Sequence, residues 1–115
     1  DMPAVVKRLE EYLIDHNGMS KSPMNLAMFL YAAEHVARIC RVLKQPGAHM
    51  LCVGVGGSGR QSLSRLASFI MGMPCFQIAI SKSYTRVEWK EDLKVRVARF
   101  PNPTATVCRL SRVHC

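Results

Sequence analysis

A glycine-rich stretch near the middle of the chain decides the fold, Gly54-Val55-Gly56-Gly57-Ser58-Gly59-Arg60-Gln61-Ser62. The short apolar run Met50-Leu51-Cys52-Val53 precedes it, and residues 63–70 follow it with helical apolar periodicity. The order strand, glycine loop, helix is the setting that a phosphate-binding loop requires. The backbone N–H groups of such a loop converge on an anion at the positive end of the helix. The stretch therefore predicts a phosphate site at residues 54–62.

Two positions of this stretch depart from the pattern of ATP-hydrolysing loops, G-x-x-x-x-G-K-[ST]. Arg60 stands at the lysine position and Gln61 at the hydroxyl position. Arg60 keeps the positive charge and can fork onto phosphate oxygens. Gln61 offers magnesium an amide oxygen, which is a weaker ligand for a hard cation. We therefore expect ATP or ADP to bind, with magnesium at Gln61 where the metal is present, and little or no hydrolysis; the alternative is a purely structural glycine turn.

Hydrolysis also requires an acidic residue at the end of a later strand, which holds magnesium and orients water. No Asp or Glu follows Asp92, and the three acids after the loop, Glu88, Glu91 and Asp92, fall on a predicted helix. Carboxylates on a helix are more often surface groups than catalytic ones. We therefore expect no catalytic residue in this chain and no hydrolytic activity of its own.

The segments around the loop predict an α/β fold. Apolar periodicity predicts helices over residues 3–15, 23–44, 60–71 and 85–98, the first ended by Asn17-Gly18 and the second started by Ser22-Pro23. Apolar runs predict strands at residues 49–53 and 75–80, and a further strand at 105–110. Strand 49–53, the helix after the loop and strand 75–80 would form a parallel βαβ core. Because a doubly wound sheet has about five strands, we expect an incomplete domain.

Composition and charge narrow the classes of partner. The chain has 115 residues, 49% of them apolar, and a net charge of +8. Residues 93–115 carry five basic residues and no acid, but only one aromatic, so we expect no nucleic-acid partner. No apolar run is long enough to span a bilayer and no signal-peptide order opens the chain, so we expect no membrane partner and a cytoplasmic setting. Cys40, Cys52 and Cys75 are predicted to be buried small apolar residues.

The run from Leu51 to Ala67, which contains Gly-Gly-Ser-Gly-Arg-Gln-Ser, closely resembles the nucleotide-binding loop of the fourth AAA+ module of axonemal dynein heavy chains. The flanking sequence resembles the same module over about residues 3–94. The segments that carry this resemblance are Asn25-Leu26 with Phe29, Glu34-His35-Val36, Arg38-Ile39-Cys40-Arg41-Val42-Leu43, Gln45-Pro46, Phe76-Gln77-Ile78 with Tyr84, and Trp89-Lys90-Glu91-Asp92-Leu93-Lys94. The resemblance implies that Arg at position 60 and Gln at position 61 are usual residues in this family.

The resemblance implies a partial P-loop AAA+ domain from a ring of such modules in a microtubule motor of cilia and flagella. It implies that ATP or ADP is held by Gly54, Gly56, Gly57, Ser58 and Gly59, with Arg60 at the lysine position and Gln61 at the hydroxyl position. The implied partners are the other modules of the ring and, through the full-length motor, dynein light and intermediate chains and microtubules. The implied location is the cytoskeleton of the cilium axoneme.

Three segments follow from the resemblance. Residues 1–22 form an N-terminal helix that leads into the module, residues 23–94 form the nucleotide-binding segment, and residues 95–115 form an atypical basic tail outside the native module. The family continues after Lys94 through an apolar strand that ends in an acid, whereas this tail is acid-free. Early termination, alternative splicing or a mispredicted sequence would explain that tail.

Two further functions stay open from the residues alone. A small P-loop nucleotide kinase would require a lysine at position 60 and an arginine-rich lid. The sequence has Arg60 at that position and shows no such lid. A non-catalytic interaction fragment would keep the loop as a structural turn and use the basic tail to bind an acidic partner.

Overall fold

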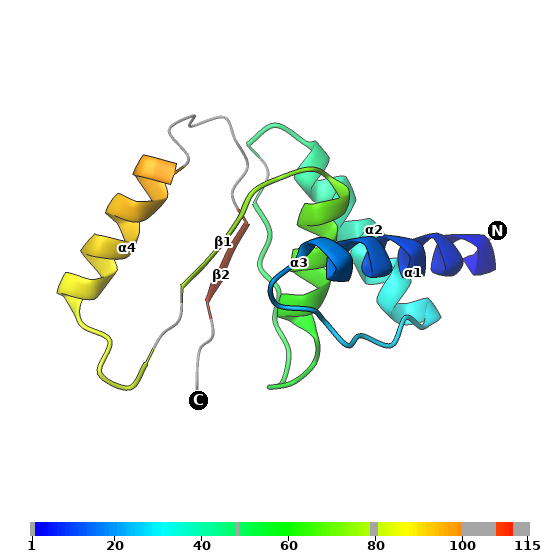
Figure 1. The fold of residues 1–115 in the computed structure, drawn as a ribbon, viewed down its shortest axis with the longest axis horizontal. Helices are drawn as coiled ribbons and strands as arrows, with labels where there is room; N and C mark the ends of the chain where they lie inside the picture. The colour runs from blue at the N-terminus through cyan, green and yellow to red at the C-terminus, as the bar shows by residue number, and fades with distance from the viewer. Residues whose placement is uncertain (1, 48, 79–80, 100–107, 112–115) are drawn as a thin grey trace.

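The computed structural model describes residues 2–47, 49–78, 81–99 and 108–111, and for 108–111 it describes the backbone alone. Helices predominate in these ranges. In chain order the elements are α1 (Met2–Met19), α2 (Leu30–Lys44), α3 (Arg60–Ile70), β1 (Cys75–Ile78), α4 (Arg86–Arg99) and β2 (Cys108–Ser111) (Figure 1). None of the helices in the described ranges has the length and apolar character needed to cross a membrane.

The hydrophobic core lies between α1, α2 and α3. Helix α3 contacts both of the other helices and both strands, so it joins the helical part of the molecule to the sheet. Small side chains allow its close approach to α2: Ala33 and Ala67 are fully buried, and the Cys40 thiol lies 4.0 Å from the Ala67 carbonyl oxygen. The core comprises Leu9, Leu13, Met24, Ala32, Ala33, Val36, Ile39, Leu43, Leu63, Leu66 and Ala67.

The predicted boundaries between the first two helices are wrong. Helix α1 continues through Asn17-Gly18 to Met19, and α2 begins at Leu30 rather than at residue 23. The reason is a long-range pair of hydrogen bonds. The Asn17 amide accepts from the Met24 N–H at 2.7 Å and donates to the Met24 carbonyl at 2.8 Å. Because this pairing engages the Met24 backbone and buries its side chain, residues 23–29 run as a non-helical segment alongside the core.

The sheet differs from the predicted βαβ core. Strands β1 and β2 pair in parallel, with Cys75 opposite Cys108 and Ile78 opposite Ser111, so α4 rather than α3 lies between paired strands in the chain. Residues 49–53 form no strand and are exposed, with Leu51 at 87% and Val53 at 83%. No described strand pairs with them, and an apolar run without a pairing partner cannot satisfy its backbone as a strand. Residues 79–80 and 105–107 of the predicted strands lie outside the described residues.

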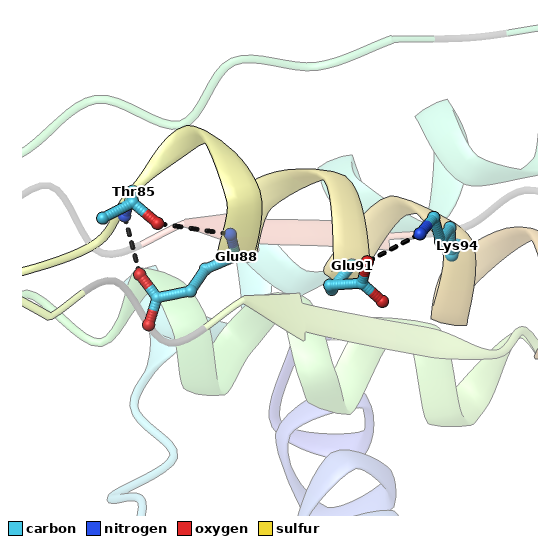
Figure 2. A network of polar contacts seen from close by, with 4 residues as sticks. All are labelled: Thr85, Glu88, Glu91 and Lys94. Carbon is cyan, nitrogen blue, oxygen red and sulfur yellow. Dashed lines mark hydrogen bonds and ion pairs between the residues drawn. The ribbon is translucent and has the colours of Figure 1, made fainter.

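Helix α4 confirms the helix predicted over residues 85–98, but it packs against little. It buries none of its residues, and Figure 1 shows it on the far side of the two strands from the other helices. Local contacts organise it instead (Figure 2). At its start the Thr85 N–H donates to the Glu88 carboxylate at 2.7 Å and the Glu88 N–H donates to the Thr85 hydroxyl at 3.4 Å, and Lys94 pairs with Glu91 at 2.6 Å. The first pair of bonds is a capping box.

The cysteines are less buried than predicted. Cys40 is half-buried, whereas Cys52 and Cys75 are exposed. The prediction fails at Cys52 because the apolar run that contains it is not covered. Burial raises the pKa of the Cys40 thiol, so this residue alone behaves as the small apolar side chain that was expected.

Candidate phosphate-binding site

The glycine loop lies directly before α3 and folds around one carbonyl oxygen. The Ser58 N–H donates to the Val55 carbonyl at 3.3 Å, which closes a turn over Gly56 and Gly57. The Arg60 guanidinium donates through Nη2 to the same oxygen at 3.1 Å. A backbone donor and a charged side-chain donor thus converge on a single acceptor. Both belong to residues that the sequence assigns to phosphate binding.

The geometry favours glycine at three positions of the loop, Gly57 and Gly59 by their positive φ and Gly54 by its close neighbours. Gly59 is the N-cap of α3 and has φ +76°, a left-handed conformation that costs other residues about 1–2 kcal/mol. A Cβ added at Gly54 would lie 3.1 Å from the Ser58 hydroxyl and 3.4 Å from the Arg60 side-chain Cδ. Gly54 therefore leaves the space through which the Arg60 side chain crosses the loop.

The start of α3 is uncapped by side chains. Gly59 has no side chain to offer, and the first intrahelical bond runs from the Leu63 N–H to the Gly59 carbonyl at 2.9 Å. The N–H groups of Arg60, Gln61 and Ser62 therefore have no acceptor within the helix. They lie at the positive end of the helix dipole, where an anion is stabilised. The uncapped helix start fits a bound phosphate group, and the space at Gly54 lets the Arg60 side chain lie beside it.

Gln61 makes a contact that its sequence position does not predict. The Gln77 side-chain NH₂ group, from strand β1, lies 3.5 Å from the Gln61 side-chain oxygen, at the outer limit of hydrogen-bond distance. The Gln77 side-chain oxygen accepts a hydrogen bond from Arg65, one turn further along α3. A row of three polar side chains thus connects the first two turns of α3 to β1.

The acids that follow the loop are engaged on or beside α4. Glu88 caps the helix start, Glu91 pairs with Lys94, and Asp92 accepts a hydrogen bond from the Tyr84 hydroxyl. Within the described ranges no group of three or more His, Cys, Asp or Glu side chains is arranged to hold a metal ion. A cavity of about 360 Å³ lies beside the loop's helix and is lined by residues including His16, Arg65, Phe69 and Gln77, but by none of residues 54–62.

The structure brings some predicted site residues together and adds others. It brings Val55, Ser58 and Arg60 to one point, and Gly54 beside them. Val55 is 79% exposed, so the loop is open to solvent. Sequence reasoning missed Arg65 and Gln77 as neighbours of Gln61. Two signals were available, the spacing of Gln61 and Arg65 at four residues on a predicted helix and a polar residue, Gln77, inside the apolar run of a predicted strand.

Comparison with known proteins then places the chain. Residues 24–110 match the family described as P-loop containing dynein motor region D4. The chain belongs to this family. The loop and the start of α3 lie inside the match, and so do β1, α4 and most of β2, which confirms the resemblance to the fourth AAA+ module of axonemal dynein heavy chains.

Individual relatives agree with this assignment. The chain is 50% identical over 94 residues to dynein axonemal heavy chain 3 of Mus musculus, a match that covers 82% of this chain and 2% of that protein. It is 52% identical over 90 residues to dynein axonemal heavy chain 12 of Homo sapiens, covering 78% and 3% respectively. Dynein axonemal heavy chain 1 of Mus musculus is 46% identical over 86 residues, covering 75% and 2%. The chain therefore spans only a few per cent of the length of these relatives.

Proposed function

We propose that residues 54–62 of this D4-family chain bind the phosphates of ATP or ADP. The observation that carries the proposal is the convergence of two donors, the Ser58 N–H and the Arg60 guanidinium, on one oxygen beside the uncapped start of α3. A phosphate oxygen is a stronger acceptor for both donors than a neutral carbonyl, because it is charged. Phosphate would therefore compete with the Val55 carbonyl for these donors.

Each residue of the loop has a distinct role in this proposal. Gly54, Gly56, Gly57 and Gly59 let the backbone approach the phosphates without side-chain obstruction. Arg60 uses one of its five N–H donors on Val55 and keeps the others for phosphate oxygens. Ser62 adds its backbone N–H at the helix start. Bound nucleotide would supply the negative charge that balances Arg60 and the helix dipole.

We infer that hydrolysis by this chain alone is slow or absent. The acids that follow the loop are engaged on or beside α4, Glu88 in the capping box, Glu91 in an ion pair and Asp92 with a tyrosine hydroxyl. The sequence holds no Asp or Glu after Asp92. A working site needs a carboxylate to hold magnesium and orient the attacking water. The chain is therefore assigned a nucleotide-binding role rather than the activity of an enzyme.

The wider assignment follows from the family. We propose that the chain acts as part of an axonemal dynein heavy chain, a microtubule-based motor of the cilium axoneme. Its direct partners would be neighbouring AAA+ modules of the ring, and dynein light and intermediate chains and microtubules would be reached through the whole motor. Within the chain, the division into residues 1–22, 23–94 and 95–115 stays a prediction.

Thermal unfolding of the 115-residue chain with ATP or ADP tests the binding proposal. A ligand at about 100 times its Kd stabilises the folded state by about 2.7 kcal/mol, which raises the unfolding midpoint by several degrees. We expect this shift with both nucleotides and no phosphate release from ATP. Arg60→Ala should weaken binding by about tenfold, which corresponds to about 1.4 kcal/mol.

Arg41→Ala is the matched control. Arg41 is exposed in the last turn of α2, away from the loop in the sequence, and carries the same charge. It should leave affinity unchanged. If the unfolding midpoint of the unmodified chain did not change with either nucleotide, the result would favour a structural glycine turn. Transfer of phosphate from ATP to a second nucleotide would favour the kinase.

A further inference from the structure

We propose that Gln61 presents an N–H donor, not an oxygen, to the bound nucleotide, because Arg65 and Gln77 fix the direction of its side-chain amide. The consequence is a nucleotide site whose affinity depends little on magnesium. This inference rests on the proposed nucleotide binding and replaces the metal-ligand role predicted for Gln61 from the sequence.

The first step is the direction of the Gln77 amide. Arg65 can only donate hydrogen bonds, so the Gln77 atom that it contacts must be the side-chain oxygen. The opposite end of the Gln77 amide is then its NH₂ group. The assignment follows from the chemistry of arginine and does not depend on telling the oxygen and nitrogen of the amide apart.

The second step is the direction of the Gln61 amide. The Gln77 NH₂ group can only donate, so the Gln61 atom that lies 3.5 Å away must be the side-chain oxygen. Gln61 and Arg65 are four residues apart on α3, which places both on one face of the helix. Gln77 therefore bridges them from β1, and all three side chains are partly buried. We call Arg65, Gln77 and Gln61 the amide relay.

The third step is to identify the end of the Gln61 side-chain amide that can contact a ligand. With its oxygen turned to Gln77, the uncommitted end of the Gln61 amide is the NH₂ group. A phosphate oxygen accepts from such a group, whereas magnesium requires an oxygen ligand. Arg60 is the neighbour of Gln61 in the chain and Arg65 is part of the relay, so the local charge also favours an anion over a cation. The relay thus selects the phosphate rather than its metal.

Calorimetric titration of the 115-residue chain with ADP tests this selection, once in excess magnesium and once in EDTA. We expect the two Kd values to agree within about threefold, or about 0.7 kcal/mol. A Kd that is about tenfold or more weaker in EDTA would overturn the inference.

Reversing the relay gives a sharper test. In Gln77→Glu the carboxylate accepts from Arg65 and also from the Gln61 NH₂ group, which turns the Gln61 oxygen toward the ligand. This variant should bind ADP at least about tenfold more tightly with magnesium than in EDTA. Gln45→Glu makes the same change at the exposed C-cap of α2 and should behave as the unmodified chain. A Gln77→Glu variant without magnesium dependence would contradict the relay.

A measurement without nucleotide separates this inference from the binding proposal. The sequence contains only three glutamines, Gln45, Gln61 and Gln77, so glutamine-selective ¹⁵N labelling gives three side-chain NH₂ signals in NMR spectra. In the unmodified chain the Gln77 signal should exchange with water more slowly than the Gln45 signal. Arg65→Met should shift the Gln77 and Gln61 signals and leave Gln45 in place.

The outcomes are distinguishable. Slow exchange at Gln77 with no binding of ADP or ATP would leave the relay standing and reject the proposed function. Binding of nucleotide together with equally fast exchange at all three glutamines would keep the proposed function and reject the relay. Because the exchange measurement uses the unmodified chain, it decides the question even where a variant fails to fold.

Discussion

Helices α1 to α3 are buried against one another, whereas residues 49–53 and α4, which also carry apolar residues, remain uncovered. The helical part supplies nearly the whole core, including the fully buried Val36 and Leu66. In contrast, Leu51 and Val53 are exposed and α4 buries no residue. Residues 49–53 form no strand because no described strand pairs with them, whereas α4 satisfies its own backbone and forms without a covering face. An apolar pattern therefore indicates a face that can be covered, but not what covers it.

The largest expected effect is on the free energy of unfolding and comes from the core between α1, α2 and α3. Leu66→Ala removes a fully buried side chain from α3 and should lower the free energy of unfolding by about 2–5 kcal/mol, from lost burial and the cavity left behind. Leu51→Ala is the matched change on the other side and should cost less than about 0.5 kcal/mol, since Leu51 is 87% exposed. Urea unfolding followed by circular dichroism measures both. Equal losses would show that residues 49–53 are covered in solution.

A smaller effect is expected on the local stability of α4. Because this helix buries no residue, its stability depends on local contacts, above all on the capping box between Thr85 and Glu88. Thr85→Ala should destabilise α4 by about 1 kcal/mol, measured as faster hydrogen exchange of its amides. Exchange in α2 should stay unchanged. Thr85→Ser keeps the hydroxyl and should retain most of the protection, so an equal loss in both variants would argue against the cap.

Elements whose signals lie within one segment could be predicted from the sequence, and elements that depend on a partner elsewhere in the chain could not. Helix α3, with Gly72 after its end, and helix α4 could be predicted because caps and periodicity lie within each segment. The start of α2 could not, because it depends on Asn17 pairing with Met24 seven residues away. The absence of a strand over residues 49–53 could not be predicted either, because it reflects a missing partner strand and not the residues of the segment itself.

For the site, sequence predicts the loop but not its neighbours. The spacing of glycines and the position of Arg60 follow from the motif, and the uncapped helix start follows from Gly59. The closure of the loop on the Val55 carbonyl depends on side-chain geometry that spacing does not contain. The contact between Gln61 and Gln77 depends on how α3 packs against β1. Such tertiary pairings leave no local signature in a single sequence.

The smallest expected effect concerns residues 96–115. The hydrogen bonds described for residues 54–62, among them those of Arg60 to Val55 and of Gln77 to Gln61, involve only residues before 96. Deleting residues 96–115 should therefore change the Kd for ATP or ADP by less than about threefold. The same deletion removes β2 and with it the pairing of β1, so the unfolding midpoint should fall even though affinity holds. Because β1 also carries Gln77, a loss of affinity beyond about tenfold would mean that β2 supports the site through β1. Residues 95–115 would then belong to the nucleotide-binding unit, in keeping with a family match that extends to residue 110.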